Sequence, residues 1–157
     1  MNRVFRILRE AYAERPFNGE GAYRFGGRWS RPGTRIAYTS EHLSLAMVEY
    51  FVHLDAGEPP TDLVIAAANV PKSVSRTTVS TAELPVDWRV MPALPRLAAI
   101  GDRFVNEAKY AVLLVPSALV PVEFNWLINP AHREFERITQ LPVESFVYDT
   151  RFFKETR

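Results

Sequence analysis

The chain has 157 residues, of which 47% are hydrophobic and 24% are charged, so composition excludes a disordered or fibrous protein and is sufficient for one packed domain. The absence of cysteine excludes disulfides, thiolate zinc sites and a cysteine nucleophile, and the net charge of +1 argues against a surface that binds polyanions throughout. We therefore expect a single domain over residues 1–157 and no direct binding to nucleic acid.

Charge is distributed unevenly along the chain. Residues 1–35 contain eight arginines, no lysine and only three acidic residues, so the rest of the chain is net negative. A guanidinium binds phosphate or carboxylate through two parallel hydrogen bonds, whereas an ammonium acts as a mobile point charge. The basic segment is therefore compatible with phosphate binding, but a solvated basic surface explains the same composition.

The first third of the chain has only weak secondary-structure patterns. Residues 5–13 are compatible with a strand that runs into a short helix or turn, and the glycine- and aromatic-rich residues 18–33 indicate an ordered loop with tight turns. Residues 1–10 lack the apolar stretch of a signal peptide, and no segment approaches the ~20 apolar residues that span a bilayer. We expect a cytoplasmic protein without membrane contact.

A strand followed by a helix is predicted next. Residues 34–39 have strand character, and Ser40 is a suitable N-cap for a helix over residues 41–54. This helix is apolar on nearly all sides, and Glu49 lies among its apolar residues. A partly buried carboxylate is paired, protonated or functional, which makes Glu49 a candidate site residue.

The remaining two thirds of the chain are predicted to be mostly β-structure. Residues 84–95 are rich in proline and are expected to be irregular, and Asp102 is expected to cap a short helix that ends near residue 108. Residues 110–115 form a continuous apolar run, typical of a strand buried on both faces. Strands are predicted at residues 63–70, 74–79, 110–115, 124–128 and 145–148. The pattern as a whole predicts an α+β domain with a mixed, mostly antiparallel β core and a few helices.

The strongest local signal for chemistry is the sequence GGRW at residues 26–29, with Tyr38 ten positions after Arg28 and Glu49 eleven positions after Tyr38. Glycines allow the backbone to approach a ligand closely. Arg28 is suited to bind a diphosphate, Tyr38 to stack on a base and Glu49 to contact a sugar. A turn arginine, a core tyrosine and a solvated helical glutamate are the ordinary structural alternatives.

Several other polar residues have ordinary structural explanations. Pro116 ends the predicted strand 110–115, and Ser117 just beyond it is expected to cap a turn, unless it contributes to a site. Asn125 and Asn129 are typical of Asx turns, and His132 is expected on the surface. Glu49 and His53 have the i, i+4 spacing of metal ligands but lack a clear third ligand, so we expect no metal site.

Five separated blocks of this sequence together resemble one family. The blocks are FNGEGAYRFGGRWSRPGTRIAYTS, SLAMVEYFVHL, IGDRF, LLVPSALVP and FNWLINPAH, in that order. They resemble the RES-domain toxins, which are named for an arginine, a glutamate and a serine, and the resemblance covers nearly the whole chain. Phe104 stands where a tryptophan is expected after Gly-Asp, which affects only a packing detail.

The resemblance assigns roles to residues of this chain. Arg28, Tyr38, Glu49 and Ser117 match the family's arginine, tyrosine, glutamate and serine, and Asn125 matches its asparagine. It implies a fold similar to that of the ADP-ribosyltransferases and a toxin that degrades NAD by phosphorolysis or hydrolysis, without a cofactor. It also implies neutralisation by a helical, Xre-type antitoxin, and leaves open whether the chain forms homo-oligomers or only toxin–antitoxin hetero-oligomers.

The resemblance also implies a mechanism. Arg28 would hold the diphosphate of NAD, with Arg6 as a further substrate-binding residue, and Tyr38 would pack against the nicotinamide. Glu49 would stabilise the positive charge that develops on the ribose, with Ser117 orienting the same region, and inorganic phosphate or water would attack. Two alternatives remain open: an ADP-ribosyltransferase that modifies a protein, and a non-catalytic, arginine-rich module that binds a nucleotide or nucleic acid.

Overall fold

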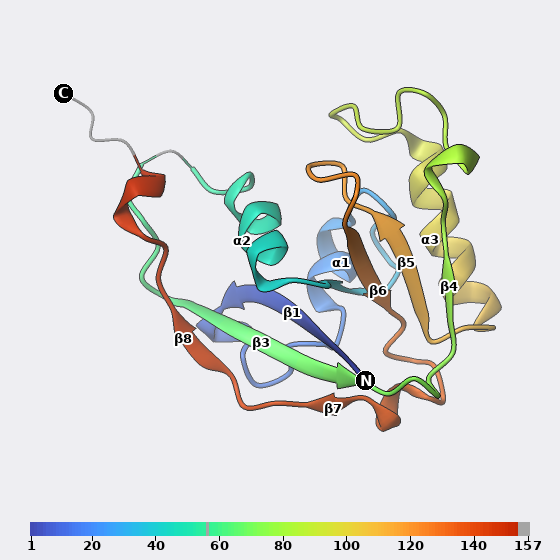
Figure 1. Cartoon of the computed structure of the whole chain (residues 1–157), viewed down its shortest axis with the longest axis horizontal. Coiled ribbons are helices and arrows are strands. Elements are labelled where there is room, and N and C mark those ends of the chain that lie inside the picture. Colours follow the sequence, from blue (N-terminus) through green and yellow to red (C-terminus); the bar gives the residue numbers. More distant parts are fainter. Residues whose placement is uncertain (56, 154–157) are drawn as a thin grey trace.

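The computed structural model describes residues 1–55 and 57–153, which form one mixed sheet flanked by helices (Figure 1). The strands of the described chain are β1 (Asn2–Arg9), β2 (Ala37–Ser40), β3 (Leu63–Val70), β4 (Arg76–Thr78), β5 (Val112–Pro116), β6 (Phe124–Ile128), β7 (Thr139–Gln140) and β8 (Glu144–Phe146). Its α-helices are α1 (Glu20–Phe25), α2 (Leu43–Phe51) and α3 (Pro95–Glu107). Single 3-10 turns occur at Glu10–Tyr12, Thr81–Glu83, Phe135–Arg137 and Thr150–Phe152.

The sheet bends sharply at its centre. The strand order is β4-β5-β6-β2-β1-β3-β7, with β8 also paired to β3, and the pairing of β4 with β5 is parallel while the others are antiparallel. Strands β1 and β2 share one register pair, Phe5 with Ser40, whereas β1 pairs with β3 along its whole length. Because so little pairing joins the two halves, β1 and β3 run crosswise to β4–β6 (Figure 1). The prediction of an α+β domain with a mostly antiparallel core is confirmed.

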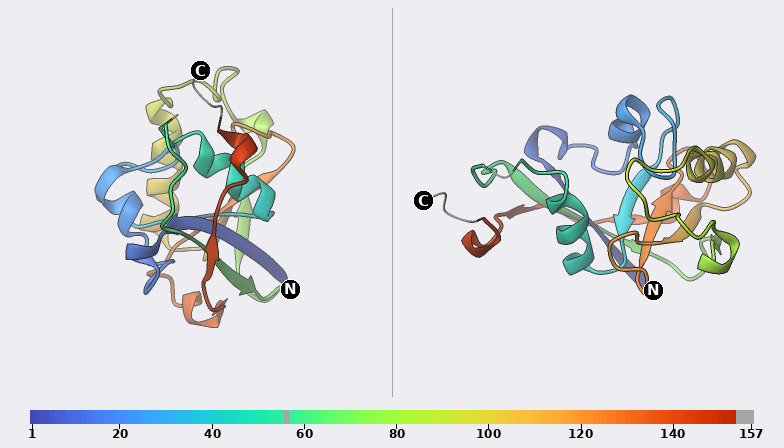
Figure 2. Two further views of the ribbon diagram at one scale, coloured as in Figure 1. Left: turned by 90° about the vertical axis from the view of Figure 1, so that its left-hand side faces the viewer. Right: turned by 90° about the horizontal axis from the view of Figure 1, so that it is seen from above.

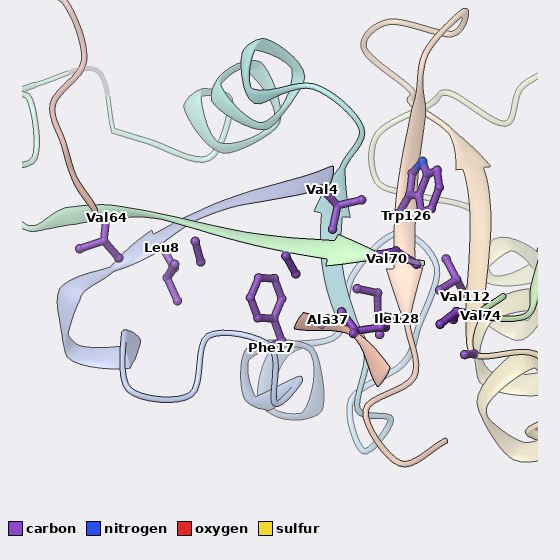
Figure 3. Close-up of a cluster of buried hydrophobic side chains, with 14 residues drawn as sticks. Val4, Leu8, Phe17, Ala37, Val64, Val70, Val74, Val112, Trp126 and Ile128 are labelled. Carbon is purple, nitrogen blue, oxygen red and sulfur yellow. The ribbon is translucent and has the colours of Figure 1, made fainter. Parts of the chain in front are cut away.

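The first apolar core fills the inside of the bend. Val4 and Leu8 of β1, Val64 of β3 and Phe17 belong to one cluster with Ala37 and residues of β5 and β6 (Figure 3). Phe17 is 2% exposed, and burying an aromatic side chain of this kind contributes roughly 1.5–3 kcal/mol. The core therefore holds the two halves of the sheet at a fixed angle.

Strand β5 is buried on both faces, as its continuous apolar sequence predicts. Val112 belongs to the core inside the bend, while Leu113 and Val115 belong to a second core beneath α3. Leu97 and Phe104 of α3 pack in this second core, which places α3 against the β4–β6 end of the sheet. The right-hand view of Figure 2 shows α3 and the C-terminal segment at opposite ends of the molecule.

Helix α3 also contacts the backbone of the segment between α1 and β2. A Cβ on Gly101 would lie 1.7 Å from the carbonyl oxygen of Trp29, so only glycine permits this approach. Asp102 Oδ1 accepts a hydrogen bond of 3.1 Å from the backbone N–H of Arg31. The predicted capping role of Asp102 is therefore wrong: α3 begins at Pro95, whose missing N–H suits the first turn of a helix.

Three further local predictions are wrong. Ser40 belongs to β2, and α2 begins two residues later than predicted, after His42. The segment 18–33 is not a loop throughout, since it contains α1. His132 is 7% exposed, not on the surface, and its Nδ1 accepts a hydrogen bond of 3.0 Å from the N–H of Glu134. The error at Ser40 has a distant cause, since its hydroxyl donates a hydrogen bond of 2.7 Å to Asn125 of β6.

The C-terminal segment packs against α2 in a third apolar cluster, which also contains Ile7 of β1 and Leu63 of β3. Tyr148 is 1% exposed and its hydroxyl donates a hydrogen bond of 2.6 Å to the carbonyl oxygen of Met47 in α2. Phe51 at the end of α2 packs edge-on against Phe152 and Phe153. This aromatic cluster fixes the position of the helix that carries Glu49. In the described part of the chain, no helix is long and apolar enough to cross a membrane.

Candidate active site

A large cavity opens where the two halves of the sheet meet α1 and α2. Its volume is about 1150 Å³, somewhat above the roughly 300–1,000 Å³ of typical small-ligand pockets. Its walls come from β1, α1, the GGRW segment, β2, α2, the segment 89–93 and the turn that follows β5. The cavity is lined by Arg6, Arg28, Tyr38, Glu49 and Asn125 among others. Residues predicted from separate sequence blocks thus meet in one space.

Glu49 is held in a fixed orientation at the cavity wall. Ser117 Oγ donates a hydrogen bond of 2.6 Å to Glu49 Oε1, and Asn125 Nδ2 donates one of 2.8 Å to the same oxygen. Among the hydrogen bonds found in the described chain, none involves Glu49 Oε2. One carboxylate oxygen is thus used for positioning, and the other remains available to a ligand hydroxyl.

Ser117 is a positioning residue with all of its hydrogen-bonding capacity in use. Its side chain is fully buried, and its Oγ accepts the backbone N–H groups of Leu119 at 3.1 Å and Val120 at 3.0 Å while donating to Glu49. The hydroxyl therefore caps the turn after β5, as the sequence suggests, and orients the carboxylate as well. The two explanations of Ser117 are compatible.

Asn125 is oriented in turn by Ser40. Ser40 Oγ donates a hydrogen bond of 2.7 Å to Asn125 Oδ1, which directs the amide nitrogen of Asn125 to Glu49. The two residues are register partners in the pairing of β2 with β6. Asn125 is therefore not an Asx-turn former, whereas Asn129 is one, because its Oδ1 accepts the N–H of Ala131 at 3.0 Å.

Arg28 approaches the cavity from the GGRW segment and is tied to the segment 88–91. Its Nη1 donates to the carbonyl oxygens of Trp88 at 3.1 Å and Val90 at 2.9 Å, and its Nη2 lies 3.7 Å from the sulfur of Met91. Burial lowers the pKa of Arg28, and the charge of Glu49 acts in the opposite direction. Among the described residues, Nε has no hydrogen-bond acceptor and Nη2 has only the weak contact with the Met91 sulfur, so this Nε–Nη2 edge is suited to bind an oxyanion through two parallel hydrogen bonds.

Tyr38 supports the GGRW segment through its hydroxyl. The Tyr38 Oη lies 2.7 Å from Ser30 Oγ and accepts the backbone N–H of Trp29 at 3.2 Å. A Cβ on Gly27 would lie 2.8 Å from the same oxygen, so a glycine is needed beside it. Burial raises the pKa of Tyr38 to about 12, so its phenol is neutral at physiological pH. Its ring also lines the cavity, where stacking on a ligand stays a prediction.

Arg6 lines the cavity from the middle of β1. It is partly buried, and this burial lowers its pKa, while the nearby Tyr50 acts in the opposite direction. Its guanidinium takes part in none of the ion pairs found in the described chain. Arg6 thus differs from Arg28, which the protein itself holds.

Glu49 and His53 have the i, i+4 spacing of metal ligands, but they do not belong to a group of residues with metal-ligand geometry. Among the described residues, such a group consists of Glu41, His42 and Glu123, whose ligand atoms lie within 4.8 Å of one another. Glu41 already accepts the N–H of Phe124 at 3.0 Å. The expectation that the protein has no metal site stays a prediction.

The residues that support the site from a distance were not predicted from the sequence. Ser40 was assigned to a helix cap, and Ser30, Gly101 and the carbonyl groups of residues 88 and 90 were given no role. Their roles depend on strand register and loop docking, and carbonyl groups carry no sequence signal at all. One local signal existed, since Gly-Asp at residues 101–102 in an otherwise helical segment indicates a close backbone approach.

Comparison with known proteins identifies the family. The model of the RES domain matches residues 3–149. The chain belongs to the RES-domain family. The family assignment made from the five sequence blocks is thereby confirmed.

Several RES-domain relatives are similar along nearly their whole length. The chain is 35% identical to "Prs ADP-ribosylating toxin" of Sphingobium sp. over 155 residues, which is 96% of either chain. It is 34% identical to "Toxin Res" of Pseudomonas putida over 148 residues (91% of this chain, 95% of the relative) and 31% identical to "Toxin Res" of Yersinia enterocolitica over 149 residues (94% and 97%).

A solved structure has the same fold. It is a chain in the crystal structure of the MbcT–MbcA toxin–antitoxin complex of M. tuberculosis, which matches with a TM-score of 0.72 over 92% of this RES-domain chain and 84% of that one. The sequences are 18% identical, so this match bears on the fold alone. It confirms the predicted architecture.

Proposed function

We propose that this RES-domain protein is a toxin that degrades NAD by breaking the bond between nicotinamide and ribose. The observation that carries the proposal is the arrangement around Glu49: one carboxylate oxygen is fixed by Ser117 and Asn125, the other is free, and Arg28 shares the cavity. A fixed carboxylate opposite a cationic side chain suits a substrate that carries a ribose next to a diphosphate. The toxin names of the relatives support the same proposal.

Glu49 would act on the transition state. As the glycosidic bond lengthens, positive charge develops on the ribose and neutral nicotinamide leaves with the electron pair of the broken bond. A carboxylate held in advance stabilises that charge without having to reorganise, which lowers the barrier and does more than tighten substrate binding. The free Oε2 is suited to accept a hydrogen bond from a ribose hydroxyl.

Arg28 would fix the diphosphate. Its Nε–Nη2 edge offers two parallel donors, and its Nη1 bonds to Trp88 and Val90 keep the guanidinium plane from rotating. Tyr38 would pack its ring against the nicotinamide while its hydroxyl holds the GGRW segment. Substrate held at both ends places the ribose carbon for attack, which is a large part of catalysis for such reactions.

The attacking group would be inorganic phosphate or water, and no cofactor is required. In phosphorolysis, a phosphate oxygen forms a bond to the ribose carbon as the bond to nicotinamide breaks. In hydrolysis, water forms that bond and releases one proton. The six arginines that line the cavity make it favourable for phosphate, so we place phosphorolysis first.

A second candidate function is transfer of ADP-ribose to a protein. It is favoured by one observation, the name of the Sphingobium relative, which is described as an ADP-ribosylating toxin. The same site would then serve, with a side chain of the acceptor protein as the attacking group. Mass spectrometry of proteins from cells that express the chain, compared with cells that express Glu49→Gln, separates the two functions by the presence of ADP-ribosylated peptides.

The partner of such a toxin would be an antitoxin protein, which we propose to be of the Xre type, in a hetero-oligomeric type II complex. The relatives named "Toxin Res" support this proposal, and the solved chain with the same fold comes from a crystal structure of a toxin–antitoxin complex. Expression of the chain alone should arrest growth, and co-expression with an Xre-type antitoxin should restore it. Growth arrest that persists with Glu49→Gln would count against the enzymatic origin of toxicity.

The decisive experiment is incubation of the purified protein with NAD, with and without inorganic phosphate, followed by identification of the products. We expect nicotinamide together with ADP-ribose 1-phosphate when phosphate is present, and slower release of nicotinamide with ADP-ribose when it is absent. Glu107→Gln, a change of an exposed helical glutamate, is the matched control for Glu49→Gln. NAD that stays intact under both conditions would overturn the proposal.

A further inference from the structure

Arg28 lies on a tight turn of the backbone, residues 27–30, which we call the Arg28 turn. Gly27 and Ser30 form an isolated antiparallel bridge, in which the N–H of Gly27 donates to the carbonyl oxygen of Ser30 at 2.9 Å and the N–H of Ser30 donates back at 3.4 Å. Arg28 and Trp29 are the two residues between them. The orientation of this turn therefore sets the direction in which the Arg28 side chain leaves the backbone.

Two other parts of the chain hold the Arg28 turn. From β2, the Tyr38 hydroxyl accepts the N–H of Trp29 and shares a hydrogen bond with the hydroxyl of Ser30. From α3, Asp102 Oδ1 accepts the N–H of Arg31, the residue directly after the turn, at 3.1 Å. Tyr38 thus fixes the turn itself, and Asp102 fixes the point at which the chain leaves it.

Helix α3 forms a rigid base for the second contact. Gly101 lets the helix approach so closely that a Cβ there would lie 1.7 Å from the carbonyl oxygen of Trp29. The side chain of Asp102 is only 15% exposed, whereas that of Arg31, whose Nη1 lies 3.6 Å from Asp102 Oδ2, is 61% exposed. Solvent screens this ion pair, so the hydrogen bond to the N–H of Arg31 is the stronger contact of Asp102.

The requirements of the helix do not explain an aspartate at position 102. Asp102 lies in the interior of α3, where aspartate is unfavourable because its short side chain competes for backbone groups. Among the described residues that line the cavity, none belongs to α3, so Asp102 does not contact a ligand there. Burial raises the pKa of Tyr38, and the charge of Asp102 adds to this effect, so the two groups that hold the turn lie near each other.

We propose that Asp102 is a positioning residue for Arg28: it anchors the Arg28 turn to α3 and thereby keeps the guanidinium in place at the cavity wall. Asp102 acts through the backbone N–H of Arg31 and does not touch the substrate. A displacement of about 1 Å in a group that binds substrate is enough to weaken catalysis. The effect on NAD rests on the proposed function, whereas the anchoring of the turn rests on the contacts of α3.

Substitution of Asp102 tests this role by steady-state kinetics. Asp102→Ala removes the acceptor and should raise KM for NAD by ~3- to 10-fold with a smaller change in kcat, since Arg28 is the group that binds the diphosphate. Asp102→Asn keeps a side-chain oxygen that accepts the N–H of Arg31, so its KM should stay close to that of the wild type. A residue that only stabilised the fold would change the melting temperature and the active fraction but not KM.

Arg31→Ala is the matched control. It removes an exposed side chain and its ion pair with Asp102 but leaves the backbone N–H in place, and Arg31 does not line the cavity. Its KM for NAD should equal that of the wild type. Equal increases in KM for Arg31→Ala and Asp102→Ala would overturn the proposal, because the ion pair and not the backbone contact would then hold the turn. A wild-type KM for Asp102→Ala would overturn it as well.

NMR measurements without substrate separate this proposal from the proposed function. Hydrogen exchange of the Arg31 N–H should be slow in the wild type, and exchange at the rate of an unstructured peptide would overturn the anchoring even if Asp102→Ala folds poorly. The Nε–H resonance of Arg28 should shift in Asp102→Ala but not in Asp102→Asn, and an unshifted resonance in both would contradict the positioning of Arg28. If these results hold while wild-type protein leaves NAD intact, Asp102 keeps its positioning role and the proposed function is wrong.

Discussion

The two charged sides of the cavity are built in different ways. On the Glu49 side, side chains hold side chains. Ser40 of β2 donates to Asn125 of β6, and Asn125 and Ser117, in the turn after β5, both donate to the carboxylate. On the Arg28 side, a side chain from an irregular segment is held by backbone carbonyl groups of another irregular segment. The carboxylate therefore depends on residue identity at several positions, and the guanidinium on the path of a distant loop.

This difference has consequences for substitution. Substitution of Ser40, Asn125 or Ser117 removes a hydrogen-bond donor, so even conservative replacements of these residues should lower activity. Changes at residues 88–91 leave the carbonyl groups in place, so none of these side chains is as critical as Arg28 itself. Wild-type activity of Glu49→Gln or Arg28→Lys would contradict this difference between the two sides, and substitutions of Ser117 and Tyr38 measure how much the supporting groups contribute.

The largest effect is expected for Glu49→Gln. The amide keeps the shape of the side chain but removes the negative charge, so turnover of NAD should fall by roughly 10²-fold or more, as for other groups that stabilise a transition-state charge. The melting temperature should stay close to that of the wild type. Nicotinamide release at the wild-type rate would remove Glu49 from the mechanism.

Arg28→Lys should be the next most damaging change. A lysine supplies one point charge in place of the planar set of donors, so it cannot bind two loop carbonyls and a diphosphate together. We expect kcat/KM for NAD to fall by roughly 10-fold or more, on the scale of hydrogen bonds to charged groups. Val90→Ala is the control, because this exposed side chain is removed while the carbonyl group remains. An equal loss in both variants would mean that the loop, not the guanidinium, is what matters.

Ser117→Ala should affect stability and activity together. It removes a donor to Glu49 and leaves the N–H groups of Leu119 and Val120 without their acceptor, which costs on the order of 2 kcal/mol of unfolding free energy. Denaturant unfolding measures this loss, and steady-state kinetics should show a lower kcat at nearly unchanged KM for NAD. In Ser40→Ala, one step further from the carboxylate, both effects should be smaller.

The smallest effect concerns Tyr38 and alkaline pH. The unfolded chain releases the phenol proton near pH 10, whereas the folded protein keeps it until about pH 12. The unfolded state therefore binds fewer protons in this window, and stability falls as pH rises from 10 to 12. Tyr38→Phe should flatten this decline, and Tyr148, whose pKa burial also raises to about 12, should keep part of it. Identical pH profiles of unfolding would contradict the buried, hydrogen-bonded phenol.

The local sequence pattern predicted strands correctly where a segment is buried in regular structure. The predicted strands at residues 63–70 and 124–128 match β3 and β6 at both ends, and the apolar run at 110–115 corresponds to a strand with a core on each face. Apolar periodicity predicts these strands because each buried face requires apolar side chains at regular positions. β7 was missed, since its two exposed residues leave no such pattern.

The local sequence pattern gave wrong predictions where a polar side chain has a hydrogen-bond partner far along the chain. Ser40 and Asp102 both satisfy the rules for helix caps, yet Ser40 bonds to Asn125 and Asp102 to the backbone of Arg31. A helix cap contributes only about 1 kcal/mol, no more than an ordinary hydrogen bond, so capping preference alone does not decide where such a side chain bonds. Tyr38 likewise uses its hydroxyl on Ser30 and Trp29.

By itself, the sequence determined the family, the α+β class and the residue types that meet in the cavity, because motif identity and apolar periodicity are properties of short segments. Only the tertiary structure decided that Glu49 Oε1 is fixed while Oε2 is free, that Arg28 is bound by loop carbonyls, and that Arg6 has no partner among the described residues. The physical reason is that hydrogen bonds depend on distances of about 3 Å between groups many residues apart, and those distances exist only after the sheet has bent around its core.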